Sequence, residues 1–476
     1  MSKSDKNKNS GSGSFIDRIE GDKVVWIIVF LLTMISALTI FSSTSQLTGG
    51  SKDRIDLIRE HGFFIIIGYL FIFILYKIKS IEWFKKVSQI GFIVSFLLLF
   101  ILDFKLNLGF VKAETINDAT RTLNLLGILQ IHVFEVVKVA MVMYLAWALS
   151  AYKQDQEKGG KTFGLVNWLS KKKRFKSLAA PGWKRFIYLY LPVILISVMC
   201  MPGSNSSMFF IGGLSLVILL IGRMPMKEIL AIIGVGVVGI AILVGISTAS
   251  DGKVLSSMRV STLVSRLQAD YSIDRLVEIE KDSLKGKGSK EWLEVRDKIK
   301  QPYTAKIAIH EGGLFGKGSG NSTQKYVVTH IYSDFMFSFI VEEYGLFGGI
   351  FVLILFVSLL ARGSTIARLC PQEFEKMAVG GLSLMITAQA FMHIFVNVGI
   401  GPMTGQTLPL ISDGSFAFLM FSIAFGIILS ISRLVRKQIK QEEEQAQPIY
   451  ENPLIEQSTK GSREDIEAEE TENEKK

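Results

Sequence analysis

Charged side chains inside a long apolar segment are the first sign of chemistry in this chain. Glu135 and Lys138 lie three residues apart within the apolar stretch 131–149, so in a helix both point to one face and can neutralise each other. An ionisable residue inside a membrane-spanning helix costs roughly 2.5–3.5 kcal/mol, so it usually faces a protein interior and has a function. Arg121, just upstream, can join the pair. A buried ion pair that only fixes helix packing is the alternative, and the residues alone leave both open.

A second acidic group lies where the apolar segment 335–361 begins. Asp334 is at its boundary, and Glu342 and Glu343 enter the segment about two helical turns later. A carboxylate in this position can cap a helix N-terminus, or it can take a proton from a reacting hydroxyl. A cap does not require the later acidic pair, so both roles stay open for Asp334.

Two glycine-containing stretches interrupt the pattern. The run 311–321 contains Lys317 but lacks the spacing of a nucleotide-binding loop, and it favours a tight re-entrant turn whose backbone N–H groups approach an anionic lipid head. The stretch 401–414 contains Thr407, Pro409 and Ser412, and it predicts a broken helix that is buried or lines a cavity. Asp413 is expected inside the last apolar segment.

The elements that position these residues are predicted to be membrane-spanning helices. The chain has 476 residues, 49% of them apolar and 20% charged, and its mean hydropathy is +0.37. Its long apolar blocks exclude a single soluble core, a nucleic-acid reader and a disordered scaffold. About 20 apolar residues cross a bilayer, which predicts an all-α polytopic protein with about ten spans. The predicted cores are 24–41, 62–76, 87–102, 131–149, 186–201, 208–222, 229–246, 335–361, 377–400 and 408–432.

Basic residues set the expected orientation. Short loops on one side are rich in Lys and Arg, as in the run 171–174, whereas the opposite short loops 202–207 and 401–407 have none. This pattern places both termini in the cytoplasm and the large loop 247–334 outside. The net charge of +10 therefore reflects membrane-flanking residues, with no nucleic-acid partner expected.

Three regions are predicted along the chain. They are a cytoplasmic polar leader at 1–23, a transmembrane domain at 24–432 and a disordered acidic tail at 433–476. Within the outer loop, the amphipathic stretch 259–282 is expected to form a helix on the bilayer surface.

In this order the features resemble the SEDS family (shape, elongation, division and sporulation), which includes the RodA, FtsW and SpoVE proteins. The resemblance runs from the first span through Arg433, and the long polar termini favour the FtsW-like branch. The chain departs from the family pattern at Thr122, Val133–Phe134, Tyr332–Ser333 and Asp413. The matching residues are Arg121, Leu125–Gly127 and Glu135–Lys138; Ala308–Ile309, Gly312–Gly318, Gly320–Ser322 and Gln324; Ser333–Phe335 and Glu342–Gly345; and Thr404–Gly414.

The resemblance implies a peptidoglycan glycosyltransferase of the bacterial cytoplasmic membrane. Such an enzyme polymerises lipid II into an undecaprenyl-diphosphate-linked glycan at the outer face, with a class B penicillin-binding transpeptidase and proteins of the division or elongation complex as partners. The essential Asp of the family matches Asp334, which is expected to be the base or to orient a divalent cation, Mg²⁺ or Mn²⁺. No nucleotide or redox cofactor is expected.

The remaining site residues are expected to bind the substrate diphosphate or to line a cavity. Cations aimed at the departing diphosphate would lower the barrier, with Glu135 positioning Lys138. A lipid-precursor flippase and a non-catalytic scaffold of the division machinery are the alternative functions, because intramembrane charges and a broken helix also suit transport. The residues in this group are Arg121, Glu135, Lys138, Lys317, Glu342, Glu343, Thr407, Pro409 and Ser412.

Overall fold

A computed structural model describes most of the chain. The basic run 171–174, the stretch 259–282 and most of the polar leader and acidic tail lie outside the described residues. The described residues within 22–431 form one compact unit, and a second unit, 1–21 with 432–476, contains the last part of helix α16. The residues described are 20–44, 54–107, 109, 111–116, 119–125, 129–157, 163, 166–167, 170, 177, 180–249, 290–326 and 331–446.

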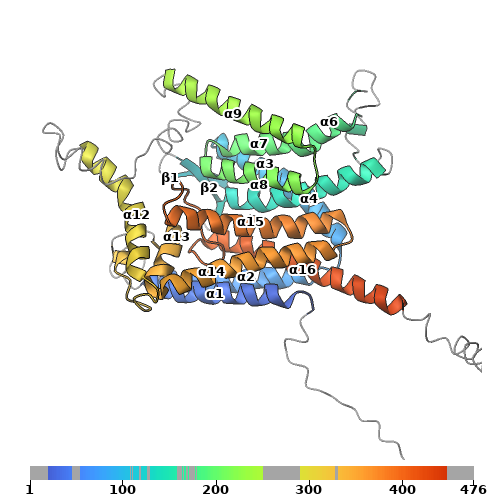
Figure 1. The fold of residues 1–476 in the computed structure, drawn as a ribbon. Coiled ribbons are helices and arrows are strands. Elements are labelled where there is room, and N and C mark those ends of the chain that lie inside the picture. The colour runs from blue at the N-terminus through green and yellow to red at the C-terminus, as the bar shows by residue number, and fades with distance from the viewer. Residues whose placement is uncertain are drawn as a thin grey trace, which may run out of the picture. The chain divides into compact units, whose positions relative to one another are not determined.

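Within 22–431 the long helices run side by side, with α9 at one edge and α1 at the opposite edge (Figure 1). Helices α12 and α13 and the small sheet lie at the same end of these helices. The elements are α1 (Lys23–Ser43), α2 (Arg54–Tyr76), α3 (Ile81–Asp103), β1 (Val111–Ile116), β2 (Ala119–Leu125), β3 (Leu129–His132), α4 (Val133–Glu157), α6 (Pro181–Arg185), the π-helical turn η4 (Phe186–Tyr190), α7 (Leu191–Cys200), α8 (Asn205–Ile221), α9 (Met226–Ala249), α12 (Lys290–Gly312), the 3₁₀ turn η6 (Gln324–Tyr326), α13 (Ile331–Asp334), α14 (Met336–Leu369), α15 (Glu373–Asn397) and α16 (Ser415–Ala446).

The prediction of an all-α polytopic membrane protein is confirmed. Among the described residues, nine helices are long and apolar enough to cross a membrane. The remaining predicted span, 208–222, coincides with α8, which has 17 residues and is shorter than the others.

Burial separates the central helices from the peripheral ones. The apolar windows of α4 and α16 are each 83% buried, whereas that of α9 is only 6% buried. A helix that is apolar on all sides and packed on all sides belongs to the core, and one with an exposed apolar surface faces lipid. Helix α4 packs between α3 and α15, and α14 packs against α15, α12 and α1. The charged residues predicted inside a span, Glu135 and Lys138, therefore lie on a buried helix, α4.

A three-stranded antiparallel sheet precedes α4 and was not predicted. Its strand order is β1-β2-β3, and Thr122 pairs with His132. The prediction that residues 131 and 132 begin a helix is wrong, because they form the end of β3 and α4 begins at Val133. The sheet fixes Arg121, next to Thr122 on β2, beside the start of α4.

Helix α14 is broken near its beginning. Gly345 has φ 71° and ψ −175°, a conformation that is essentially restricted to glycine. A side chain there would meet the carbonyl oxygen of Leu314 at 2.2 Å. The break therefore lets the loop after α12 pack directly against the backbone of α14.

Candidate active site

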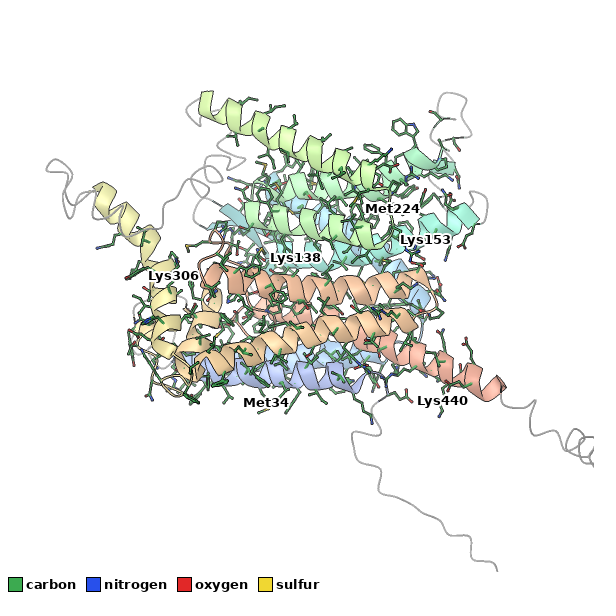
Figure 2. The ribbon with its side chains drawn as sticks, in the orientation of Figure 1. Met34, Lys138, Lys153, Met224, Lys306 and Lys440 are labelled. Atoms are coloured by element: carbon green, nitrogen blue, oxygen red, sulfur yellow. The ribbon has the colours of Figure 1, made fainter. Side chains whose placement is uncertain are left out.

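Lys138 is the centre of a buried polar network between α4 and α15 (Figure 2). Its side chain is only 1% exposed, and its ammonium donates to Glu135 at 2.6 Å. Two further donations go to Gln389 Oε1 at 2.6 Å and Gln406 Oε1 at 3.0 Å. An ammonium has three donors, so all of them are used within the protein. Lys138 therefore links α4 to α15 and to the loop 401–414. A direct contact with a ligand would require one of these hydrogen bonds to break.

A second cation lies near this network. Arg121, Glu135 and Lys138 all act electrostatically on His132, which ends β3 just before α4. Arg121 is only partly buried, in contrast to Lys138. The sheet thus brings the predicted Arg–Glu–Lys group together, and Arg121 is its more accessible cation.

Three polar residues of α15, Gln389, His393 and Asn397, lie four residues apart and therefore share one face of the helix. His393 Nε2 accepts from the Phe337 N–H at 3.4 Å, and Asn397 Oδ1 accepts from the Ser338 N–H at 3.0 Å. The first N–H groups of a helix have no partner within it. Two residues of α15 therefore supply the cap of α14.

This cap bears on the role of Asp334. Asp334 ends α13, and the N-cap residue of α14 is Phe335, whose own side chain makes no capping hydrogen bond. The Asp334 side chain accepts from Ser333 Oγ at 3.0 Å, and its carbonyl accepts from Asn397 Nδ2 at 3.2 Å. Side chains of α15 accept hydrogen bonds from the N–H groups of Phe337 and Ser338. The carboxylate of Asp334 is therefore not needed to cap these two groups.

The loop 401–414 joins Asp334 to the Lys138 network. A Cβ built on Gly405 would lie 3.8 Å from Asp334 Oδ2, which places the carboxylate against this loop. The next residue, Gln406, accepts from Lys138 and also bonds His393 Nδ1 through its carbonyl at 2.7 Å. Two neighbouring loop residues therefore face the acid and the buried cation.

The same loop contains the other predicted residues of this stretch. The Thr407 carbonyl accepts from Gln389 at 3.1 Å, and Ser412 Oγ accepts from the Leu408 N–H at 2.9 Å. Pro409 is buried in the turn that Ser412 closes. The predicted broken helix is thus a buried turn next to Lys138.

One prediction here is wrong. The last span was expected to begin at Leu408 and to contain Asp413, but α16 begins at Ser415. Asp413 lies in the loop, where its N–H donates to the Tyr332 carbonyl at 2.9 Å. Its carboxylate lies 3.9 Å from His61 Nδ1. The apolar residues 408–411 are buried in a turn, so a hydropathy pattern cannot distinguish them from a helix.

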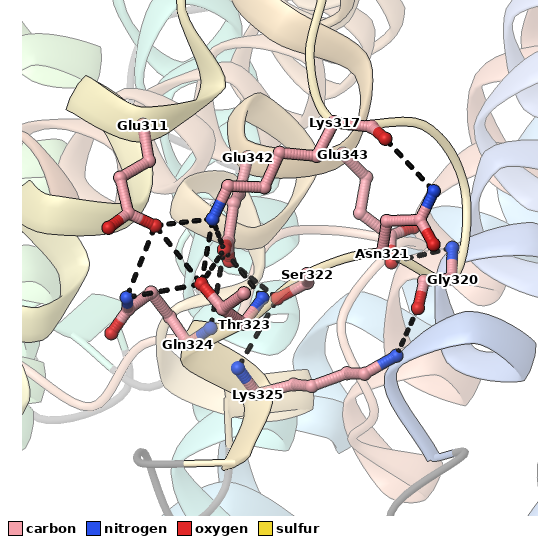
Figure 3. Close-up of polar contacts among 10 residues, drawn as sticks. All are labelled: Glu311, Lys317, Gly320, Asn321, Ser322, Thr323, Gln324, Lys325, Glu342 and Glu343. Atoms are coloured by element: carbon pink, nitrogen blue, oxygen red, sulfur yellow. Dashed lines mark hydrogen bonds and ion pairs between the residues drawn. The ribbon is translucent and has the colours of Figure 1, made fainter.

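Glu342, Glu343 and Lys317 form a separate cluster that holds the glycine-rich loop (Figure 3). Glu342 Oε1 accepts from Lys317 Nζ at 2.8 Å and from the Thr323 N–H at 2.8 Å. Glu343 accepts from the Gly320 N–H at 2.9 Å. Both carboxylates therefore bind the loop 312–326.

Lys317 also bonds the more exposed Glu311. The hydrogen bond from Lys317 is the main cause that lowers the pKa of Glu311. Partial burial acts to lower the pKa of Lys317, but its hydrogen bonds to Glu311 and Glu342 outweigh this effect, so the pKa is raised. The pair is therefore charged throughout the neutral range.

Asp334 and Lys138 both adjoin the loop 401–414, which contains Thr407, Pro409 and Ser412. Glu135 is bonded to Lys138, and Arg121 lies on β2 near His132. Lys317, Glu342 and Glu343 form the separate cluster at the glycine-rich loop. Sequence reasoning missed Gln389, His393, Asn397 and Gln406. The first three repeat every fourth residue within an apolar run, and that spacing is the signal that would have found them.

Asp334 is the residue expected to orient a divalent cation. Among the described residues, no group of three or more His, Cys, Asp or Glu side chains gathers to hold a metal ion. Asp334 alone does not form a complete protein site for a cation. Mg²⁺ often binds through one or two carboxylates together with substrate phosphates.

Comparison with known proteins gives a family match across most of the chain. A family model described as a cell cycle protein, named for FtsW, RodA and SpoVE, matches residues 22–437. The chain is 27% identical to the "Probable peptidoglycan glycosyltransferase FtsW" of Enterococcus hirae, over 88% of this chain and 95% of that protein. It is 25% identical to "Stage V sporulation protein E" of Bacillus subtilis, over 87% of this chain and 98% of that protein.

Two solved structures share the fold. One, from a study titled "Structural coordination of polymerization and crosslinking by a peptidoglycan synthase complex", has a TM-score of 0.59 at 19% identity and covers 87% of this chain and 98% of that one. The other is the rod shape determining protein RodA of Thermus thermophilus, with a TM-score of 0.53 at 19% identity, covering 87% of this chain and 97% of that one.

Proposed function

Because the chain belongs to the cell cycle protein family of FtsW, RodA and SpoVE, we propose that it is a peptidoglycan glycosyltransferase that polymerises lipid II into glycan strands for septal or cell-shape synthesis. One observation supports this most directly. Gly405 lies against the carboxylate of Asp334, and its neighbour Gln406 binds the buried Lys138. A proton acceptor and a cation-bearing network thus adjoin one loop, as the transfer of a sugar from a diphosphate requires.

In the proposed reaction an acceptor sugar hydroxyl attacks the anomeric carbon of the donor. The new C–O bond forms as the bond from that carbon to the diphosphate oxygen breaks, and Asp334 takes the hydroxyl proton. The departing undecaprenyl diphosphate gains negative charge, and Arg121 is the cation proposed to stabilise it. Glu135 and Lys138 position Gln406 and the loop. Lys317, Glu342 and Glu343 hold the neighbouring glycine-rich loop.

Partners and orientation are part of the same proposal. The protein spans a membrane, and we place it in the bacterial cytoplasmic membrane with both termini in the cytoplasm and the end that carries α12 outside. A class B penicillin-binding transpeptidase is the proposed partner. The structural neighbour from a synthase complex that couples polymerisation to crosslinking supports this choice.

The test is glycan synthesis by purified protein and its transpeptidase partner in detergent, with lipid II as substrate. The wild type should make glycan strands, whereas Asp334→Asn should make none while eluting as a folded protein. Asp56→Asn is the matched control, because Asp56 is exposed and pairs only loosely with Arg59, at 3.8 Å. A flippase would make no strands in detergent, where no second leaflet exists, and an active Asp334→Asn protein would remove this residue from the mechanism.

We also propose that a divalent cation binds together with the substrate beside Asp334 and assists the reaction. EDTA should then lower glycan synthesis, and added Mg²⁺ or Mn²⁺ should restore it. Without lipid II, EDTA should leave the melting temperature unchanged, because within the described part of the chain no group of three or more His, Cys, Asp or Glu side chains could hold the ion. Full activity in EDTA would exclude the cation.

A further inference from the structure

The loop after α12 presents apolar side chains outward. Leu314 and Phe315 are exposed, Phe315 at 80%, and the Phe315 ring lies 5.5 Å from that of Phe347 on α14. Leu346 and Phe347 are exposed beside them. These four residues, Leu314, Phe315, Leu346 and Phe347, are called the Phe315 edge below.

Some of the polar side chains of the same loop point inward, whereas Ser319 and Asn321 are exposed. Ser322 and Lys325 are buried, and Lys317 turns toward Glu342, which is 0% exposed (Figure 3). Soluble proteins show the opposite distribution, with charged residues outside and large apolar ones inside. This inverted polarity is the pattern of a surface that faces lipid.

The outward position of the edge is fixed by the backbone. Leu346 N–H donates to the Gly313 carbonyl at 2.9 Å, and Lys317 N–H donates to the Glu342 carbonyl at 2.9 Å. A Cβ on Gly316 would lie 2.3 Å from the Glu343 carbonyl oxygen, so the two backbones are in direct contact. The loop is thus built onto the break in α14, and Phe315 cannot turn inward without breaking these bonds.

The length of α14 gives the level of the edge in a bilayer. Residues 345–361 of α14, which end before the charged Arg362, extend about 25 Å at about 1.5 Å per residue, close to the thickness of a hydrocarbon core of about 30 Å. The break at Gly345 therefore lies at a membrane boundary. The exposed apolar side of α14 continues from Phe347 through Ile350, Phe351 and Ile354, so the edge extends a lipid-facing stripe.

We propose that the Phe315 edge is inserted into the bilayer, with Leu314 and Phe315 at the boundary between acyl chains and headgroups. In the proposed orientation this is the outer leaflet. Aromatic residues are enriched at this depth, and the loop enters the membrane without crossing it. The partner of this surface is bilayer lipid. This inference depends on the membrane assignment and not on the glycosyltransferase activity.

Depth can be measured with a nitroxide label on Phe315→Cys. The two native cysteines, Cys200 and Cys370, are both buried, and replacing them with Ala gives a background without labelling. The purified chain is placed in vesicles of phosphatidylethanolamine and phosphatidylglycerol, without any partner protein. Collisions of the label with oxygen, which concentrates in the bilayer, are compared with collisions with a water-soluble nickel chelate.

The label at 315 should collide more with oxygen than with nickel. Ser319→Cys, in the same loop and exposed, is the matched control and should collide more with nickel. Leu314→Cys provides a second lipid-facing position if Phe315→Cys does not fold. A label at 314 or 315 that prefers nickel would overturn the proposal. Shielding from both reagents would also overturn it, because a second copy of the chain would then cover the edge.

Discussion

The backbone N–H of Ser338 donates to Oδ1 of Asn397 at 3.0 Å, so the start of α14 is capped by a side chain of α15. Asn397 also donates to the carbonyl of Asp334. The two bonds fix the turn between α13 and α14, where Asp334 lies. The position of the proposed base is therefore set by a neutral amide on another helix.

Asn397→Leu should impair both folding and turnover. The substitution leaves the buried Ser338 N–H without its acceptor, which costs about 1–3 kcal/mol, and it releases the Asp334 carbonyl. A misplacement of about 1 Å can cost roughly 100-fold in rate, so we expect kcat for glycan synthesis to fall more than KM rises. Ser338→Ala is the control, since it removes only the hydroxyl bond and keeps the N–H bond. Normal kcat in Asn397→Leu would exclude a positioning role.

Lys138→Met should lower the melting temperature and abolish glycan synthesis. Breaking a buried ion pair leaves an uncompensated charge on Glu135 and costs about 3–5 kcal/mol. Adding Glu135→Gln removes that charge, so the double variant should regain much of the lost thermal stability. Activity should stay low if the ammonium is needed to hold Gln406. Recovery of both stability and activity in the double variant would mean that the pair serves packing alone.

The sequence predicted the helices well because their signal is physical and local. A run of about 20 apolar residues has few alternatives to a membrane span, and each predicted core coincides with a helix. The predicted start of the last span was wrong because Leu408 and Ile411 are apolar residues buried in a turn, and hydropathy does not distinguish such a turn from a helix. The sheet was missed because strands β1 to β3 are short and lie between strong helical segments.

Prediction of the site was less complete for a related reason. A charge within a span is costly and stands out, so Glu135 and Lys138 were singled out from the sequence. Neutral amides such as Gln389 and Asn397 cost less free energy to bury than charged side chains, so they give a weaker signal in the sequence. Their importance depends on which atoms they meet on other helices, and only the fold provides this information.

Gly345→Ala should lower the melting temperature strongly. The positive φ costs about 1–3 kcal/mol for a residue with a side chain, and the new methyl group would meet the Leu314 carbonyl oxygen at 2.2 Å. The loop would have to move away from α14, so thermal unfolding in detergent should occur at a lower temperature. Gly213→Ala on α8 is the control, because no atom lies within 4 Å of a Cβ there. Similar melting temperatures for both variants would contradict the close backbone contact.

The Glu311–Lys317 pair predicts how the glycine-rich loop responds to pH. Lys317 has a raised pKa, so its stabilising effect is present below its ordinary value of about 10.4 and is lost as the pH rises through the folded value. Glu311 has a lowered pKa, so its effect is present above about 4.3 and is lost as the pH falls through the folded value. A nitroxide at Ser319→Cys should therefore be equally immobile from about pH 5 to 10 and become mobile in stronger base. Lys317→Gln should remove that alkaline change, whereas Glu311→Gln should keep it because Lys317 still bonds Glu342. An alkaline change that persists in Lys317→Gln would assign it to another group.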